Sequence, residues 1–337
     1  MKLLITGSTG YIGKHIVATA LARGHNVRAT LRTASREAEV RDAVAHGPLD
    51  FITAELLQDA GWAAAMDGID AVLHTASPVP LRAPKHTDSV LGPAIEGTER
   101  VLDAARAAGV ERVILTSSIA AIQGGAHKTT PYGPDDWTDP DHPDVGVYAR
   151  SKTLAERAAW AFVAEKAPQI ALTTVNPGFV FGTPRDRTYG SSIKLLERIF
   201  RGIDPALPRL SFACVAVQDV AEAHLAAVER PEHGRAAHRC RRPLAVDEGH
   251  RRYRAQRRSS LKTRSARSAR LADQDRGPFQ SGHPPQVTSD IGWQAQFDYT
   301  SLREVLTGDP IPPQDAIAET AKFIGDKLAE QRSLLGI

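Results

Sequence analysis

The stretch that decides the fold is Lys2-Leu-Leu-Ile-Thr6, followed by Gly7-Ser-Thr-Gly10-Tyr-Ile-Gly13. A short apolar run, a loop with three glycines and an amphipathic segment are typical of a strand, a turn and a helix. Gly7 permits a tight turn, Gly10 lets the backbone approach a pyrophosphate, and Gly13 allows close packing of helix on strand. The start of such a helix offers free N–H groups and a positive dipole end to phosphates. The stretch therefore predicts a dinucleotide-binding loop.

Apolar runs and helical patterns alternate through the first 176 residues. Strands are expected at Lys2–Thr6, Val27–Leu31, Asp50–Thr53, Ala71–His74, Arg112–Thr116 and Leu172–Asn176. Helices are expected at Tyr11–Arg23, Glu37–Ala45, Ile95–Ala108 and Tyr148–Lys166, with left-handed caps at Gly24, Gly47 and Gly109. This alternation predicts the α/β class, with a Rossmann-type doubly wound parallel sheet.

The pattern becomes less regular after Pro177. Helices are expected at Ile193–Arg201, Asp219–Glu229 and Ala316–Gln331, and a strand at Phe212–Val217. We therefore expect residues 1–176 to form a dinucleotide-binding domain that includes the catalytic helix. Residues 177–337 are expected to form mainly a smaller C-terminal substrate lobe.

The charge of the chain is unevenly distributed. Its 42 Lys and Arg against 39 Asp and Glu give a formal charge of +3. Residues 235–285 hold 14 of the basic side chains and 4 of the acidic ones, so the rest of the chain holds 28 basic and 35 acidic. An acidic body thus carries one very basic segment. The body itself gives no reason to expect a nucleic-acid partner.

Composition also excludes several classes of protein. No apolar run approaches the ~20 residues that span a bilayer, and no secretory signal is visible at the N-terminus. The two cysteines, Cys214 and Cys240, form no Cys-x-x-Cys pair, so a cytoplasmic protein without a disulfide scaffold is expected. No metal site is expected, because the histidines are scattered and the acidic loop before Tyr148 lacks the glycine spacing of a calcium loop.

The end of the second strand indicates which cofactor the loop would bind. An NAD-selective fold usually has Asp or Glu about 20 residues beyond the glycines, to hold the ribose 2′-hydroxyl. This chain has Arg32 there, 19 residues after Gly13, and Arg36 follows one helical turn later. Because a guanidinium suits a 2′-phosphate, NADP(H) is favoured over NAD(H).

Three residues suit the reduction of a carbonyl. Tyr148 and Lys152 lie four apart on one predicted helix and so share a face. Ser118 follows the strand Arg112–Thr116 at the carboxyl edge of the sheet, where ligands bind. A neighbouring ammonium is expected to lower the tyrosine pKa from its usual value near 10 toward the working range. Ser118 would hold the carbonyl oxygen in line.

These motifs resemble those of the extended short-chain dehydrogenases/reductases of the NAD-dependent epimerase/dehydratase superfamily. The glycine loop, Thr116-Ser117-Ser118 and Tyr148-x-x-x-Lys152 carry the resemblance. The dihydroflavonol reductase and aldehyde reductase branch is indicated by Val27–Arg32, Thr75-Ala76-Ser77-Pro78, Asp136-Trp137-Thr138-Asp139, Tyr148–Arg157 and Asn176–Gly182. The resemblance covers about residues 1–234 and resumes from Val287 to Trp293. The cinnamoyl-CoA reductase signature around the tyrosine is absent, which argues against that substrate.

The resemblance implies roles for individual residues. Ser118, Tyr148 and Lys152 match the catalytic residues, and Lys152 would also bind the nicotinamide ribose. The implied cofactor-binding residues are Gly7, Thr9, Gly10, Tyr11, Ile12, Gly13, Arg32, Arg36, Glu55, Leu56, Thr75, Ala76, Ser77, Tyr148, Lys152, Pro177, Gly178, Phe179 and Val180. One departure weakens the preference for NADP, because Glu39 stands where some plant relatives have a phosphate-binding lysine.

The basic segment 235–285 departs from the family pattern. Val, Ile, Leu, Met and Phe supply five of its 51 residues, and no helical or strand period is present. It could be a nucleic-acid-binding insert, a disordered loop, or a stretch translated out of frame. We favour the last hypothesis, because the family pattern is lost and regained abruptly. An out-of-frame stretch would damage the substrate pocket.

The function expected from the sequence is an NADP(H)-dependent carbonyl reductase or alcohol dehydrogenase. Its substrate would be a small or medium aldehyde, ketone or flavanonol-like carbonyl. A nucleotide-sugar epimerase/dehydratase or a hydroxysteroid dehydrogenase is the alternative among enzymes. A non-catalytic NADP-binding regulator or a nucleic-acid binder is the alternative from another class. The partner expected is a small molecule, and either a monomer or a homodimer fits the family.

Overall fold

The computed structural model describes residues 1–44, 46–77, 88–203, 211–230, 241–244, 292–306 and 308–335. Seven strands of these residues form one parallel sheet in the order β3-β2-β1-β4-β5-β6-β9. Their bounds are β1 Lys2–Thr6, β2 Asn26–Leu31, β3 Leu49–Thr53, β4 Ala71–His74, β5 Arg112–Thr116, β6 Ala171–Pro177 and β9 Arg241–Leu244. The chain runs outward from β1 to β3 and then returns to the other side of β1 at β4. The ends of β1 and β4 therefore meet at the reversal point, where ligands bind in doubly wound sheets.

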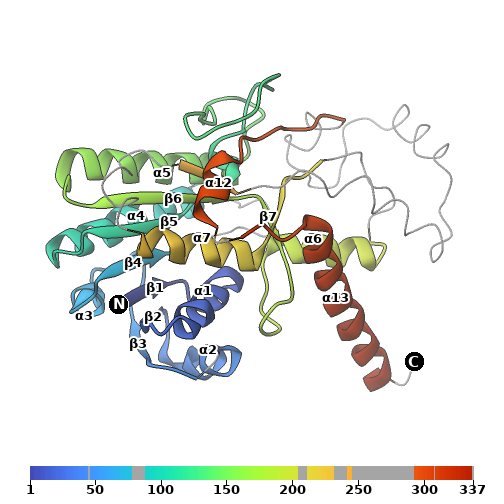
Figure 1. Cartoon of the computed structure of the whole chain (residues 1–337), viewed down its shortest axis with the longest axis horizontal. Coiled ribbons are helices and arrows are strands. Elements are labelled where there is room, and N and C mark those ends of the chain that lie inside the picture. Colours follow the sequence, from blue (N-terminus) through green and yellow to red (C-terminus); the bar gives the residue numbers. More distant parts are fainter. Residues whose placement is uncertain are drawn as a thin grey trace.

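Helices cover both faces of the sheet (Figure 1). On β1, Leu3 and Ile5 belong to one apolar core and Leu4 to the other, as the alternation of strand side chains requires. The first core is covered by α1 (Tyr11–Ala22) and α7 (Val217–Glu229). The second is covered by α3 (Trp62–Met66), α4 (Asp88–Ala107) and α5 (Val147–Lys166). The expected α/β fold is confirmed.

A second, smaller sheet lies outside the main one. It pairs β7 (Phe179–Phe181) with β8 (Cys214–Ala216), and α6 (Ser191–Phe200) and α13 (Pro313–Leu335) pack nearby. The other helical elements within the described residues are η1 Ala34–Arg36, α2 Glu37–Ala43, η2 Ile119–Ala121 and α12 Thr300–Val305. Although it follows the predicted boundary at residue 177, α7 packs on α1, β5 and β6. Residues beyond 177 thus also cover the main sheet.

The sequence predicted each strand from β1 to β6 to within one residue at either end. It did not predict α3, β7, β9 or α12, and it placed the start of α4 at Ile95 rather than Asp88. Gly24 and Gly109 have the expected positive φ of 79° and 71°. The left-handed cap expected at Gly47 is wrong, because α2 already ends at Ala43 with Val44 extended.

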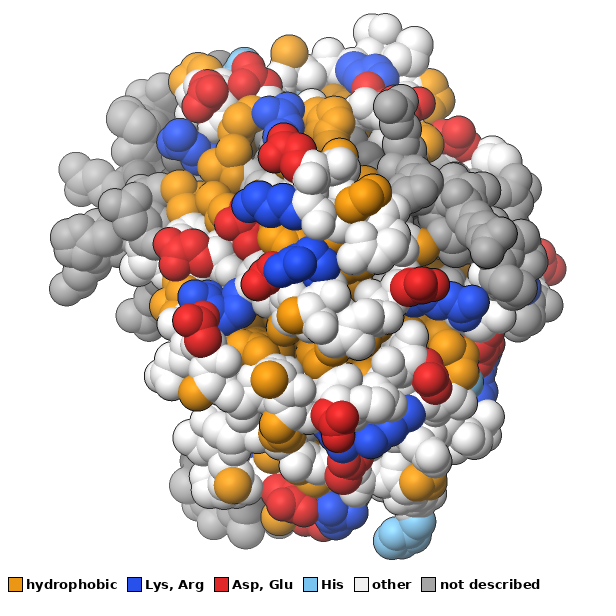
Figure 2. Space-filling model, turned by 90° about the vertical axis from the view of Figure 1, so that its left-hand side faces the viewer, with side chains coloured by type: hydrophobic (Ala, Val, Ile, Leu, Met, Phe, Trp, Pro, Cys, Tyr) orange, Lys and Arg blue, Asp and Glu red, His pale blue; other side chains and the backbone are white. Residues whose placement is uncertain are grey.

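Most of the basic segment 235–285 lies outside the described residues. The part that is described, Arg241–Leu244, pairs with β6 as the edge strand β9. Among the described side chains on the face drawn in Figure 2, Lys and Arg alternate with Asp and Glu, and neither sign gathers in a patch. Within the described ranges, no helix is both long enough and apolar enough to cross a membrane.

Candidate active site

The glycine loop sits where the sequence predicted, between β1 and α1. Gly7 has φ +70°, and a Cβ on it would lie 2.7 Å from the Ala76 nitrogen and the Thr75 Oγ1. A Cβ on Gly13 would lie 2.2 Å from the Gly7 oxygen. The first turn of α1 has no side-chain cap, since Gly10 is its N-cap, so its N–H groups are available to an anion. The loop fits a pyrophosphate group.

The side chain of Tyr11 has a structural partner instead of facing the loop. Its hydroxyl donates to the Gly182 carbonyl at 3.0 Å, and the residue is buried against the edge of His15. Burial, together with the charge of Glu319, raises the pKa of this phenol. The Tyr11 side chain ties α1 to the segment after β7, so only the backbone of Tyr11 is left to contact a cofactor.

Arg32 and Arg36 follow β2, but they differ in their contacts. Arg32 is exposed, and no hydrogen bond or ion pair to it occurs among the described residues. Arg36 donates through Nη1 to Thr9 Oγ1 in the glycine loop at 3.0 Å, and it forms an ion pair with Glu39. Arg36 thus contacts the glycine loop, and Arg32, the residue directly after β2, is the one without a partner in the described chain.

The segment after β3 contains Glu55 and Leu56. The Glu55 carboxylate accepts from Gln58, and the Glu55 carbonyl accepts from Trp62 Nε1 at 3.1 Å. Leu56 packs against Gly97 of α4, where a Cβ would lie 2.8 Å from its side chain. These contacts fix the segment at the carboxyl edge of the sheet, beside β2.

The segment after β4 is tied directly to β1. Thr75 donates through Oγ1 to the Thr6 carbonyl at 2.6 Å, and the Ala76 N–H donates to Thr6 Oγ1 at 3.1 Å. His74 also bonds this hydroxyl, at 2.7 Å. Burial, with the charge of Lys152, lowers the pKa of His74 to about 3, so the ring is neutral. Thr75 and Ala76 consequently lie against Gly7, as expected of residues that line a cofactor.

Ser118, Tyr148 and Lys152 come together at the carboxyl end of β5. Ser118 is buried and caps η2 by accepting the Ala120 N–H at 3.2 Å. Burial raises the pKa of Tyr148, and the influence of the Ser118 hydroxyl opposes that rise. Lys152 Nζ donates to the Thr116 carbonyl at 3.1 Å. Ser118 thus lies near enough to Tyr148 to influence the pKa of its phenol, and Lys152 lies one turn further along the same helix.

The electrostatics differ from the sequence prediction. The tyrosine pKa was expected to be lowered by Lys152, but it is raised by burial, and the lowering contribution comes from Ser118. The pKa of Lys152 itself falls to about 8 through burial, against the opposing charge of Glu156. For both groups, the cost of burying the charged form outweighs the opposing effect of their neighbours on the pKa.

Glu156 is a site residue that the sequence analysis missed. It is fully buried on α5, one turn beyond Lys152. Its carboxylate accepts from Ser117, from Asn176 at 2.8 Å and from Thr174 at 3.3 Å. It thus binds the catalytic helix to the ends of β5 and β6. The four-residue spacing from Tyr148 to Lys152 to Glu156 was the signal that could have found it.

The segment Pro177–Val180 lies beside Ser118, whose hydroxyl donates to the Pro177 carbonyl at 3.4 Å. A Cβ on Gly178 would lie 2.3 Å from the Ala213 carbonyl oxygen, so glycine is required there. Phe179 donates its N–H to that same carbonyl at 2.8 Å. Close approach of β7 and β8 therefore holds this segment against the triad.

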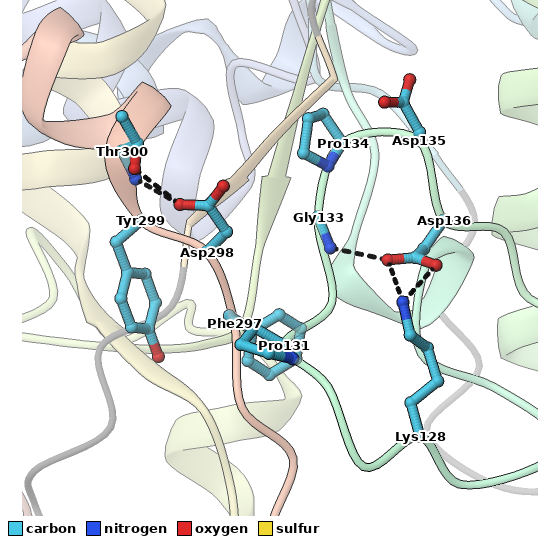
Figure 3. Close-up of a pocket in the computed structure, with 10 residues that line it drawn as sticks. All are labelled: Lys128, Pro131, Gly133, Pro134, Asp135, Asp136, Phe297, Asp298, Tyr299 and Thr300. Carbon is cyan, nitrogen blue, oxygen red and sulfur yellow. Dashed lines mark hydrogen bonds and ion pairs between the residues drawn. The ribbon is translucent and has the colours of Figure 1, made fainter.

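A pocket open to solvent lies between the loop before α5 and the segment after residue 291 (Figure 3). It is lined by Lys128, Pro131, Gly133, Pro134, Asp135, Asp136, Phe297, Asp298, Tyr299 and Thr300. Lys128 forms an ion pair with Asp136 at 2.6 Å. Tyr132 and Phe297 pack with Ile119 and Ile122 of the turn after Ser118. The pocket therefore borders an apolar cluster that includes the turn directly after Ser118.

No group of three or more His, Cys, Asp or Glu within the described ranges is placed to hold a metal ion. The described site instead combines a phosphate loop with a serine, a tyrosine and a lysine. That combination can bind a dinucleotide and exchange a proton with an oxygen atom placed between Ser118 and Tyr148.

Comparison with known proteins agrees with this geometry. Residues 3–240 match the model of the NAD dependent epimerase/dehydratase family. Tetraketide alpha-pyrone reductase 2 of Arabidopsis thaliana is 32% identical over 68% of this chain and 75% of that protein. Cinnamoyl-CoA reductase CAD2 of Medicago truncatula is 35% identical over 67% of this chain and 71% of that protein. The solved yeast methylglyoxal/isovaleraldehyde reductase Gre2, complexed with NADPH, shares the fold at TM-score 0.75 and 22% identity, covering 98% of this chain and 99% of that one.

Proposed function

The chain belongs to the NAD dependent epimerase/dehydratase family, in which it is an oxidoreductase, and we propose that it is an NADP(H)-dependent carbonyl reductase or alcohol dehydrogenase. The proposed substrate is a small or medium aldehyde, ketone or flavanonol-like carbonyl. The observation that carries the proposal is that Ser118, Tyr148 and Lys152 come together at the sheet edge that holds the glycine loop, where Lys152 Nζ donates to the Thr116 carbonyl and Ser118 influences the pKa of Tyr148. The relatives are reductases by name, which supports the proposal.

The residues around the glycine loop fit a dinucleotide. A Cβ on Gly7 would fill the space beside Thr75 and Ala76, so this surface is shaped for a close backbone approach. Arg32, exposed at the end of β2, would hold the 2′-phosphate that distinguishes NADP(H) from NAD(H). Glu55 and Leu56 would contact the adenine, and Pro177–Val180 the carboxamide.

The chain's own residues would manage the oxygen of the substrate. A bound reduced nicotinamide supplies the hydride that goes to the carbonyl carbon. Ser118 donates a hydrogen bond to the carbonyl oxygen and holds it against the phenol. Tyr148 donates its proton to that oxygen as the alcohol forms, and the ammonium of Lys152 stabilises the phenolate that remains.

The protonated state of Tyr148 suits the reductive direction. A phenol with a pKa above its usual value stays protonated at neutral pH, as a proton donor must. Alcohol oxidation needs the phenolate instead. We therefore expect oxidation to be faster at alkaline pH and reduction to be the main reaction near neutral pH.

Oxidation of NADPH across a panel of aldehydes and ketones tests the proposal. Tyr148→Phe is expected to lower the rate by about 100-fold or more, since a general acid contributes roughly 10²–10⁴. Tyr189→Phe is the control, because it removes the same atom from a tyrosine whose hydroxyl bonds Glu197 at 2.7 Å in the smaller lobe. Equal rates for wild type and Tyr148→Phe would refute the mechanism.

A further inference from the structure

The strongest feature that the proposed mechanism leaves unused is a chain of ion pairs beside the glycine loop, built around one buried lysine. It begins at Arg36, passes through Glu39 and Lys14, and ends at Asp186 in the segment after β7. Lys14 lies on α1 and is 1% exposed, although it is a lysine. A lysine is almost never fully buried unless it is paired, so this chain of charges is a built feature of the fold.

Glu39 is at the centre of the chain. Its carboxylate accepts from Arg36 Nε at 2.8 Å and from Arg36 Nη2 at 2.9 Å, a two-point contact. The same carboxylate pairs with Lys14 Nζ at 2.6 Å. Burial alone would raise the pKa of Glu39, but the hydrogen bonds and charges of Arg36 and Lys14 outweigh it and hold the pKa below its usual value. Glu39 therefore carries a full negative charge at neutral pH.

That charge lies next to the phosphate-binding elements. Arg36, which Glu39 holds, also donates to Thr9 Oγ1 in the glycine loop at 3.0 Å. Arg36 and Lys14 contribute two positive charges, and Glu39 and Asp186 two negative ones, so the cluster has no net charge to attract a phosphate. A 2′-phosphate would compete with Glu39 for Arg36 and would meet its negative charge at short range.

We propose that Glu39 sets the cofactor selectivity of this chain, by withholding Arg36 from the 2′-phosphate and leaving Arg32 alone to bind it. This rests on the proposed NADP(H) site. The consequence is that the preference for NADPH over NADH is weak, because the attraction of Arg32 is opposed by Glu39. NADH has no 2′-phosphate, so Glu39 has no such effect on its binding.

Titration with NADPH and with NADH, followed by the cofactor fluorescence, tests this selectivity role without any substrate. Glu39→Gln keeps the shape of the side chain and removes its charge. We expect Glu39→Gln to tighten NADPH binding about tenfold, because it removes one negative charge near the 2′-phosphate. NADH binding should stay within about twofold of the wild-type value. Glu37→Gln is the matched control, because it makes the same charge change on the same helix at an exposed pair with Arg41. It is expected to change neither affinity by more than about twofold.

The outcomes separate the two proposals. NADPH affinity that is unchanged or weaker in Glu39→Gln, with measurable binding by the wild type, would overturn the role of Glu39 and leave the cofactor site standing. An equal gain for NADPH and NADH would also overturn it, because the effect would then not involve the 2′-phosphate. Failure of the wild-type chain to bind either cofactor would overturn the proposed function and this inference together.

Discussion

Replacement of Lys152 by methionine is expected to abolish carbonyl reduction and, at the same time, to stabilise the fold. Lys152 is 6% exposed, and Nζ donates to the Thr116 carbonyl at 3.1 Å. Burial lowers its pKa from 10.5 to about 8, against the opposing charge of Glu156. Methionine has a similar length and no charge, so it removes the cost of holding a cation in this place while keeping most of the packing.

The magnitude follows from the pKa. Keeping Lys152 charged at neutral pH costs about 3 kcal/mol, at ~1.36 kcal/mol for each unit by which its pKa falls. Against this, the variant loses the hydrogen bond to Thr116, which costs about 1 kcal/mol. The expected net gain is about 1–2 kcal/mol, or several degrees in Tm.

The stability gain of Lys152→Met should fall as the pH rises. Below about pH 8 the folded and unfolded chains both carry the Lys152 proton, so the cost is present in full. Between pH 8 and 10.5 the unfolded chain keeps a proton that the folded chain has lost, so wild-type stability rises with pH. The advantage of the variant should therefore shrink as the pH rises above 8.

Denaturant unfolding at pH 7 and pH 9.5, together with the NADPH oxidation rate, measures both effects. Lys166→Met, at the exposed end of the same helix, is the control and should change neither quantity greatly. A Lys152→Met variant that is less stable than wild type at pH 7, or one that keeps its activity, would refute the reasoning.

Three further changes test other parts of the structure. Gly13→Ala should cost about 2–4 kcal/mol of unfolding free energy, because its Cβ would lie 2.2 Å from the Gly7 carbonyl oxygen. Asp219→Asn should gain about 1–2 kcal/mol at pH 7, because burial raises the Asp219 pKa to about 6 and asparagine can still accept the Ile311 N–H. Since that carboxyl loses its proton more readily in the unfolded chain, the gain should disappear as the pH falls below about 4. Arg32→Ala should weaken NADPH binding about tenfold or more and leave NADH binding within about twofold.

For each of these three variants, one result would contradict the expectation. Gly325→Ala, on a helix with open space around the added Cβ and no positive φ, is the control for Gly13→Ala, and equal losses of stability would show that the contact with Gly7 is unimportant. For Asp219→Asn, a gain that persists at pH 4 would rule out the carboxyl as its cause. For Arg32→Ala, equal losses for both cofactors would exclude a role at the 2′-phosphate.

The fold was predictable because it depends on local patterns. Buried parallel strands are continuous apolar runs, so Leu3–Ile5 and Val113–Leu115 can be read directly from the sequence. The short elements were not predictable, because packing decides them. Phe179 in β7 is held by the approach of Ala213, which is more than 30 residues away. Gly47 shows the converse. Its place after a helical pattern resembled a helix cap in the sequence, but in the structure it lies against Leu21 instead.

The site was predictable where a motif has fixed geometry, and not where partners come from distant segments. The four-residue spacing of Tyr148 and Lys152 was enough to find them once the glycine loop and the strand end at Ser118 stood upstream. Spacing could not indicate that the Tyr11 hydroxyl donates to the Gly182 carbonyl. Nor could it indicate that the Glu156 carboxylate accepts hydrogen bonds from Ser117 and Asn176. The direction of the Tyr148 pKa was mistaken for the same reason, because burial is a property of the whole fold.

The central claim is that a hydride passes to a carbonyl carbon while Tyr148 protonates the oxygen. Reduction of an aldehyde or ketone with NADPH deuterated at the transferred position of C4 tests it most directly, with the alcohol analysed by mass spectrometry. The account predicts one deuterium on the former carbonyl carbon with the wild-type enzyme, and at least about 100-fold less product from Tyr148→Phe. Alcohol without the label, or labelled product formed equally fast by both proteins, would contradict it.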